Sequence, residues 1–207
     1  MRILYIDTSS SYLYTSIVEN NKLLAEVKEE YGQSLSEVAL PRIVSMFENN
    51  NLQATDIDKI IVVSGPGSFT GIRIGITIAK VYAWSLNIPI TTILSLQAMS
   101  ISSKNKKVHV PMINARRGYV FAAIYDEDYN EILKPQHIKM DDLKEQLKDI
   151  SDYEVISNDD LEPFTNIESY DPDMEKIVNY FEDKEPINPH AVNPDYLKLT
   201  EAEESKL

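Results

Sequence analysis

Alternation of apolar and polar residues predicts three strands at the start of the chain. Residues 2–7 form an apolar run that ends at an acidic residue, and two alternating runs cover residues 12–19 and 22–29. Asn20 and Asn21 separate the second run from the third, and such a pair is typical of a tight hairpin turn. The chain is therefore expected to open with three antiparallel strands.

Helical spacing of apolar residues begins after the third strand. Ser34 is a predicted N-cap, with Glu37 three residues later as its capping-box partner. This region is predicted to contain helices over residues 34–49 and 70–86 and strands over residues 58–64 and 89–94. The predicted order of elements is β-β-β-α-β-α-β.

The pattern after residue 100 is weaker but of the same kind. Strands are predicted over residues 108–114, 119–126 and 132–140, and helices over residues 141–148 and 174–181. Residues 157–173 are polar and are predicted to form loops, and the end of the chain from Glu201 is predicted to fray. We expect two subdomains, residues 1–100 and residues 101–207.

The amino-acid composition is typical of a globular protein and argues against a secreted or membrane-spanning one. The chain is 43% hydrophobic and 26% charged, which is ordinary for a globular domain, and it contains no cysteine. The carboxylate of Asp7 comes too early for a secretion signal, and no stretch approaches the roughly 20 apolar residues of a membrane span. We therefore expect a cytoplasmic protein with no membrane partner.

The negative net charge of the chain disfavours nucleic acid as a direct partner. The formal net charge is −13, and most of it lies in residues 101–207, which carry 24 acidic and 13 basic residues. An acidic surface repels phosphate backbones, and non-specific binding to nucleic acid depends on basic contacts. The chain is not expected to hold RNA alone, so a partner would have to supply the positive charge.

A glycine-rich segment runs from Gly65 to Gly75, between a predicted strand and a predicted helix. Such a turn can aim backbone N–H groups of Gly67 and Ser68 at an anion. It contains neither Gly-Lys-Ser/Thr nor Gly-x-Gly-x-x-Gly, the phosphate-binding and dinucleotide-binding signatures. The pattern alone favours the alternative, in which the glycines serve backbone geometry.

Gly71, Gly75 and Ala79 recur every four residues and so form a stripe of small side chains on one face of the predicted helix. Glycine inside a helix costs roughly 0.5–1 kcal/mol relative to alanine, so two of them indicate that something packs closely there. That neighbour is either an element of the same domain or a helix of a second subunit.

Four segments together resemble the TsaB (YeaZ) family. They are Ile6-Asp7-Thr8-Ser9, the glycine segment, Asn114-Ala115-Arg116-Arg117-Gly118 and Asn193-Pro194-Asp195-Tyr196-Leu197. The resemblance is good over residues 1–125 and looser beyond. It implies an α/β fold of the actin-like kind (ASKHA, ribonuclease H-like), with two subdomains of mixed sheets flanked by helices.

The resemblance also implies a function. Members are non-catalytic subunits that bind and activate TsaD, which transfers a threonylcarbamoyl group to the adenosine beside the anticodon of ANN-decoding tRNAs. The ATPase TsaE joins them, and the same surface can form a homodimer. ATP and a metal ion act in the partner subunits, no cofactor is expected on this chain alone, and tRNA is reached only indirectly.

Partner binding is expected from the two helices of the first subdomain. The predicted contact residues are Leu35, Val38, Ala39, Arg42, Ile43 and Met46 on the first helix and Gly71, Gly75 and Ala79 on the second. The catalytic relative carries His-x-x-x-His on its first helix, whereas this helix has no histidine. His109, His137 and His190 lack the spacing of metal ligands, so no metal site is expected.

Other functions stay open. An autonomous actin-like ATPase or kinase would use Asp7 at a Mg-phosphate site, with Thr8 and Ser9 beside it. Against that function, Gly118 is the only glycine after residue 100, which leaves the second half without phosphate loops. A peptidase is disfavoured because His-Glu-x-x-His and cysteine are both absent. Arg116 and Arg117 could bind an anion, such as an RNA phosphate in the complex, but the sequence favours a charged hairpin turn.

Overall fold

The computed structural model describes residues 1–105 and 107–198 of the 207-residue chain. Within these residues, two five-stranded mixed sheets are flanked by helices, and no helix has both the length and the apolar character needed to cross a membrane. The fraying predicted from Glu201 concerns residues outside these ranges.

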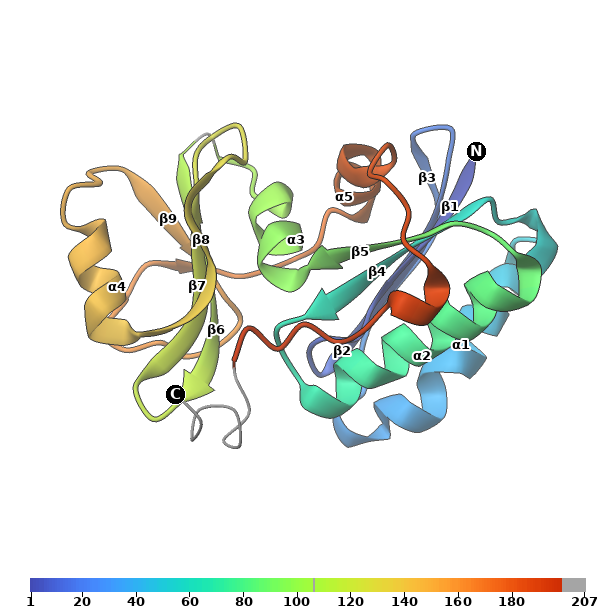
Figure 1. Cartoon of the computed structure of the whole chain (residues 1–207), viewed down its shortest axis with the longest axis horizontal. Coiled ribbons are helices and arrows are strands. Elements are labelled where there is room, and N and C mark those ends of the chain that lie inside the picture. Colours follow the sequence, from blue (N-terminus) through green and yellow to red (C-terminus); the bar gives the residue numbers. More distant parts are fainter. Residues whose placement is uncertain (106, 199–207) are drawn as a thin grey trace. The chain divides into compact units, whose positions relative to one another are not determined.

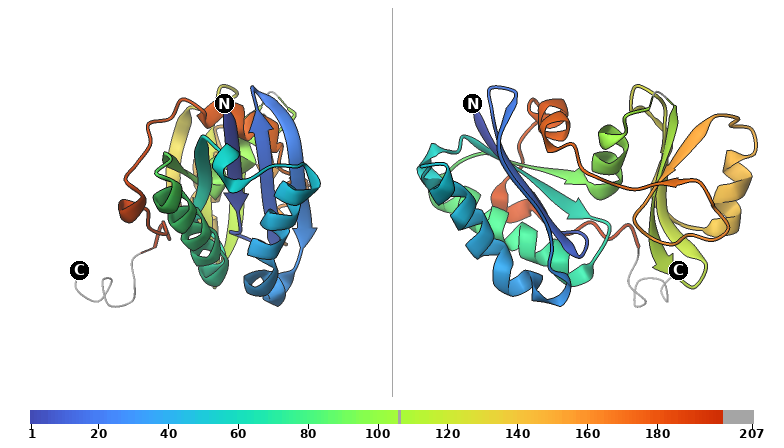
Figure 2. Two further views of the ribbon diagram at one scale, coloured as in Figure 1. Left: turned by 90° about the vertical axis from the view of Figure 1, so that its right-hand side faces the viewer. Right: turned by 180° about the vertical axis from the view of Figure 1, so that it is seen from behind.

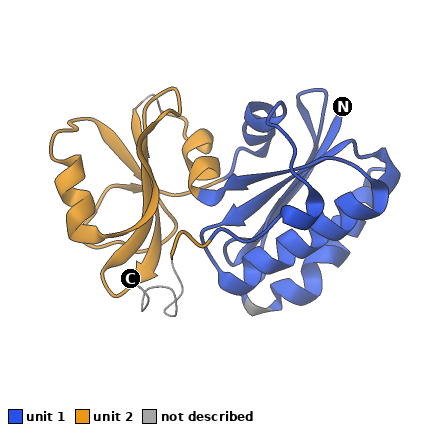
Figure 3. Ribbon diagram, in the orientation of Figure 1, with its two compact units in different colours: residues 1–95, 172–195 blue, residues 96–171, 196–207 orange. Residues whose placement is uncertain are grey.

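The chain folds into two compact units, coloured separately in Figure 3. Unit 1 contains residues 1–95 and 172–195, and unit 2 contains residues 96–171 together with the described residues from Tyr196 onward. The sequence pattern placed every residue after 100 in the second subdomain. This division needs correction, because the segment 172–195 packs with unit 1.

The sheet of unit 1 has the strand order β3-β2-β1-β4-β5. Its strands are β1 (Arg2–Asp7), β2 (Tyr12–Glu19), β3 (Lys22–Glu30), β4 (Lys59–Gly65) and β5 (Ile90–Leu94). The first three are antiparallel, as predicted, while β4 and β5 run parallel to β1. Strands β1 and β4 are buried along nearly their whole length because both faces of the sheet are covered.

Three helices cover this sheet. α1 (Leu35–Asn49) and α2 (Phe69–Leu86) lie side by side on one face, and α5 (Met174–Phe181) covers the other (Figures 1 and 2). Ser34 precedes α1 as predicted, but its side chain makes no capping hydrogen bond, so the predicted capping box is not formed. A 3-10 turn over Gly32–Ser34 runs directly into α1 and gives Ser34 helical backbone angles, which turn its hydroxyl away from the helix N–H groups.

The sheet of unit 2 repeats the connectivity of unit 1. Its strands are β6 (Val108–Arg116), β7 (Tyr119–Tyr125), β8 (Glu131–Lys139), β9 (Tyr153–Ile156) and β10 (Ile167–Glu168). Read from β8, their order is β8-β7-β6-β9-β10, which matches β3-β2-β1-β4-β5 position by position. The repeated unit confirms the predicted actin-like fold.

Two helices lie on opposite faces of the second sheet. α4 (Met140–Leu147) packs on the face that carries Val120 and Ala122, and α3 (Ser95–Ser102) packs on the face that carries Ala123 and Tyr125. Residues of one strand alternate between the two faces, so each face has its own core.

Apart from short 3-10 helices, three elements were not predicted, namely α3, β9 and β10. α3 lacks an amphipathic pattern because all of its residues except Gln97 are buried, so it has no polar face to reveal a helical period. β9 has four residues and β10 has two, and the latter lies in the polar segment predicted to be loop.

The returning segment 172–195 is fixed to unit 1 by backbone contacts. Nζ of Lys59, at the start of β4, donates to the carbonyl oxygens of Glu182 at 2.6 Å and Lys184 at 2.7 Å. Burial lowers the pKa of Lys59 below its usual value. Farther along, the N–H of Asp195 donates to the carbonyl oxygen of Ser64 at 2.8 Å.

Candidate functional site

The turn after β1 carries the residues predicted for a nucleotide or anion site. Asp7 is 2% exposed and Thr8 is fully buried. The Asp7 carboxylate accepts the N–H of Ser9 at 2.8 Å and the hydroxyl of Tyr5 at 3.4 Å. Burial raises the pKa of Asp7 above its ordinary value, and these hydrogen bonds offset only part of that rise. Asp7, Thr8 and Ser9 therefore lie in the interior of unit 1, whereas Ser10 and Ser11 are exposed.

Thr8 joins this turn to the backbone of α2. Its hydroxyl donates to the carbonyl oxygen of Gly71 at 2.7 Å and accepts the N–H of Gly75 at 3.0 Å. A Cβ at Gly71 would overlap the backbone oxygen of Thr8, and a Cβ at Gly75 would overlap its hydroxyl. Ala79 continues the stripe and is fully buried.

The stripe therefore packs on the chain itself. The prediction that Gly71, Gly75 and Ala79 contact another subunit was wrong, and the alternative, a neighbour within the same domain, is correct. The missing side chains let the helix axis approach the end of β1.

The loop before α2 also packs against the chain itself. The backbone oxygen of Asp195 occupies the place of a Cβ at Gly65, and that of Ser9 occupies the place of a Cβ at Gly67. The N–H of Ser68 donates to the same Ser9 oxygen at 2.7 Å. The predicted anion site required that N–H to point at a ligand. Close approach of the backbone thus explains the two glycines, which is what the pattern favoured.

Helix α1 turns most of its predicted contact residues inward. Four of the six are buried in unit 1, namely Leu35, Ala39, Ile43 and Met46. Val38 is half-buried, and Arg42 is exposed but pairs with Glu29 at 3.1 Å and donates to the hydroxyl of Tyr31 at 2.7 Å. The prediction selected a helical row correctly but assigned it to the wrong side, because that row packs against the sheet.

A different set of apolar side chains points outward from the two helices. Its members are Leu40 (53% exposed), Val44 (46%), Phe69 (56%), Val81 (58%) and Trp84 (64%), and we call this set the helical face. The Phe47 and Tyr82 rings stack at 6.4 Å between centroids, which brings the second halves of α1 and α2 together. The helical face was not predicted, although Leu40 and Val44 lie only one position beyond the predicted row.

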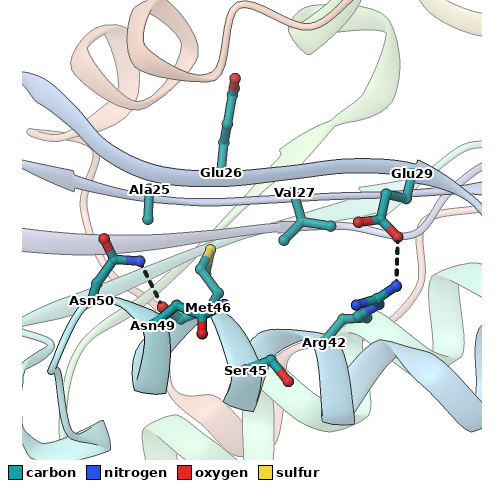
Figure 4. A pocket seen from close by; sticks show the side chains of 9 residues that line it. All are labelled: Ala25, Glu26, Val27, Glu29, Arg42, Ser45, Met46, Asn49 and Asn50. Atoms are coloured by element: carbon teal, nitrogen blue, oxygen red, sulfur yellow. Dashed lines mark hydrogen bonds and ion pairs between the residues drawn. The ribbon is translucent and has the colours of Figure 1, made fainter.

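A groove lies between α1 and the edge strand β3, with a volume of about 300 Å³ (Figure 4). Ala25, Val27 and Met46 give it an apolar floor, while the side chain of Glu26 points away from it. The ion pair between Arg42 and Glu29 stands at one end. The groove extends the accessible surface of α1 towards the edge of the sheet.

No cluster suited to a metal ion was found. Residues 1–105 and 107–198 contain no group of three or more His, Asp or Glu side chains placed to hold one. His109 lies in unit 2 beside Ser100, His137 stacks on Tyr119, and His190 contacts Trp84.

Ser100 and His109 form a pair that sequence spacing did not reveal. The Ser100 hydroxyl lies 3.0 Å from Nδ1 of His109, and Nε2 lies 3.1 Å from the carbonyl oxygen of Asn105. Both side chains are almost completely buried. A nucleophile and its base need an open site and an orienting carboxylate, whereas this histidine is oriented by a backbone carbonyl. We interpret the pair as structural.

A family model and two sequence relatives of this chain all belong to the biosynthesis of threonylcarbamoyladenosine in tRNA. The family model described as "TsaD: tRNA N6-adenosine threonylcarbamoyltransferase" matches residues 22–165. The tRNA threonylcarbamoyladenosine biosynthesis protein TsaB of Bacillus subtilis (strain 168) is 30% identical, over 98% of this chain and 96% of its own length. The protein of the same name from Escherichia coli (strain K12) is 33% identical, over 64% of this chain and 58% of its own length.

A solved structure, YeaZ from Pseudomonas aeruginosa, matches with a TM-score of 0.73 over 95% of this chain and 99% of its own chain. Its sequence identity is 16%, so this match concerns the fold.

The contact between Thr8 and Gly75 can be tested by a double-mutant cycle. We expect Gly75→Ala to lower the free energy of unfolding by about 1–3 kcal/mol because its Cβ displaces the Thr8 hydroxyl. In a Thr8→Ala background Gly75→Ala should lower the free energy of unfolding much less, because the other atoms nearest to the added Cβ lie 3.5 Å and 3.6 Å from it. Urea unfolding of the four proteins measures the coupling, with the exposed Thr77→Ala as control. A coupling below about 0.5 kcal/mol would contradict the assignment.

The buried Asp7 predicts a pH-dependent stability. Its pKa is raised above 3.8 in the folded chain, so the folded state binds this proton more tightly than the unfolded state. The resulting stabilisation is complete below pH 3.8 and is lost as the pH rises through the folded-state pKa. Asp7→Asn should therefore gain stability relative to the unchanged chain between about pH 3 and pH 7. Urea unfolding across this range tests it, and a constant difference would refute it.

Proposed function

Because the chain belongs to the TsaB family, whose curated members are named for tRNA threonylcarbamoyladenosine biosynthesis, we infer that it acts in this modification. We propose that it does so as a non-catalytic cytoplasmic subunit that binds and activates a TsaD protein. The helical face carries this proposal. It places five large apolar side chains of two adjacent helices in water, and burial of such side chains against another protein would be favourable.

The arrangement of α1 and α2 supports a helix-on-helix contact. The two helices lie side by side (Figure 1), so their outward rows present parallel ridges. Val81 and Trp84 are one helical turn apart on α2, as are Leu40 and Val44 on α1, and aromatic and aliphatic side chains of this kind form the core of protein interfaces. The same face serves a homodimer when TsaD is absent, and TsaE joins the complex formed with TsaD.

Interior packing of the Asp7 turn supports the non-catalytic role. A Mg-phosphate site needs carboxylate oxygens that reach a hydrated ion, whereas Asp7 is 2% exposed and its oxygens bond to Ser9 and Tyr5. We therefore propose that ATP and metal ions act in the partner subunits. The rival, an autonomous ATPase or kinase, would require this turn to open.

Association with TsaD is the test of the proposal. The purified chain and its cognate TsaD are mixed, and the mass of the complex is measured by light scattering with and without ATP. We expect a stable complex and no ATP hydrolysis by this chain alone. The absence of a complex, together with intrinsic ATP turnover that Asp7→Ala abolishes, would favour the rival.

A single charge on the helical face should weaken the complex. Val81→Glu places a carboxylate at a position that is 58% exposed in the free chain and desolvated in the proposed complex. We expect the Kd for TsaD to rise at least about tenfold, while the free energy of unfolding changes by less than about 0.5 kcal/mol. Ile132→Glu is the matched control, because Ile132 is 54% exposed but lies on β8 in unit 2. Equal Kd values for the two variants would show that the helical face is not the contact surface.

A further inference from the structure

The hairpin between β6 and β7 holds two arginines in an unusual backbone conformation. Arg116, Arg117 and Gly118 have φ angles of 64°, 53° and 78°, so all three lie in the left-handed region. Two-residue turns of this kind favour Asn-Gly, because most side chains are strained there. Arg117 occupies the first of the two turn positions, where a left-handed backbone is unfavourable for a side chain of this size. Backbone strain of this kind is common at functional sites, so a binding role for the side chain is worth testing.

The base of the hairpin is firmly held. The side-chain oxygen of Asn114 accepts the N–H of Arg116 at 2.8 Å, and the N–H of Asn114 donates to the carboxylate of Asp159 at 2.7 Å. On the other side, the carbonyl oxygen of Gly118 accepts the N–H of Met140 at 2.9 Å. These contacts fix the backbone and leave both arginine side chains exposed.

Both guanidinium groups lack acidic partners. Across residues 1–105 and 107–198, neither Arg116 nor Arg117 makes an ion pair or a side-chain hydrogen bond, whereas Arg2 pairs with Glu19 and Arg42 pairs with Glu29. This is notable in a chain with 33 acidic and 20 basic residues, where carboxylates are abundant. Among the described residues, no carboxylate neutralises these two positive charges.

A third cation and two stacked rings lie on the same face of the sheet. Tyr119 stands opposite Arg116 on β6 and opposite Lys139 on β8, and directly opposed residues share a face. Lys139 is exposed. The Tyr119 and His137 rings stack at 4.6 Å with an angle of 5° between their planes, and Phe121 lies 5.3 Å from His137. Cations thus flank a flat aromatic pair.

We propose that this surface, formed by Arg116, Arg117, Lys139, Tyr119 and His137, binds RNA directly within the complex with TsaD, which replaces the expectation that tRNA is reached only indirectly. The guanidinium forks hold backbone phosphates, and the Tyr119–His137 pair supports a ribose or an unpaired base. The planar fork of arginine suits phosphate oxygens, and aromatic faces next to such contacts suit single-stranded or looped RNA. This inference rests on the proposed function, because a chain of net charge −13 needs a partner to bring RNA close.

The test measures RNA binding by the assembled complex. A fluorescently labelled transcript of an ANN-decoding tRNA is titrated with the complex by anisotropy at several salt concentrations. For Arg116→Ala/Arg117→Ala we expect the Kd to rise about tenfold and the slope of log K against log salt to fall by about 1–2, one for each lost phosphate contact. Tyr119→Ala should raise the Kd with little change in that slope, because stacking releases no counterions.

The matched control is Lys144→Ala/Lys148→Ala. These lysines lie on or next to α4 of the same unit, where they pair with Asp141 and Glu145. Their replacement by alanine removes the same number of positive charges as the arginine variant. We expect the control to bind tRNA like the unchanged complex. An equal loss of tRNA affinity in both double variants would show that only net charge matters, and it would overturn the inference. Unchanged tRNA affinity of the arginine variant would overturn it as well.

Affinity for TsaD, measured on the same proteins, separates this inference from the proposed function. The arginine variant should bind TsaD normally. If its affinity for TsaD falls while its affinity for tRNA is unchanged, the hairpin contacts protein and the RNA inference is wrong. If the unchanged chain does not bind TsaD, both proposals fail.

Discussion

The close contact between Thr8 and the backbone of α2 is the constraint on which the first unit depends. One hydroxyl bonds to two backbone groups of the helix, and this is possible only because Gly71 and Gly75 carry no side chain. The contact brings α2 against the end of β1 and closes the turn that holds Asp7. It also fixes the rotation of the helix, so that Val81 and Trp84 face water. The interior turn and the outer helical face are therefore two results of one packing arrangement.

Each unit offers a surface of different chemistry. Unit 1 exposes apolar side chains on two neighbouring helices, and unit 2 exposes the cations of Arg116, Arg117 and Lys139 beside stacked rings. Apolar burial is not weakened by the screening of charges and holds two proteins together, whereas phosphate contacts are weakened strongly by salt and position a nucleic acid. An acidic chain gains from this division, because its general repulsion of RNA restricts contact to the place where cations are concentrated.

Helical spacing of apolar residues predicted α1 and α2, and apolar or alternating runs predicted most strands, including β1 and β4, which are buried on both faces. These patterns did not reveal α3, which is buried almost all round. For α1, periodicity identified the apolar row that contains Leu35, Ala39 and Ile43, but it did not show that the sheet of the same chain covers this row. The glycine stripe showed that something approaches closely, but a stripe alone cannot distinguish a neighbouring strand of the same chain from a second protein.

The return of residues 172–195 to unit 1 affects how the protein folds during synthesis. Strands β1 to β5 are translated before unit 2, yet the segment that bonds to Lys59 and Ser64 is translated after residues 96–171 of unit 2. Until then, the buried end of β4 and the outer edge of β5 lack their cover. Unit 2 is complete in sequence, apart from the residues that follow 195, before unit 1 can close. Contacts this distant along the chain form slowly, so the first unit to be translated is the later one to be finished.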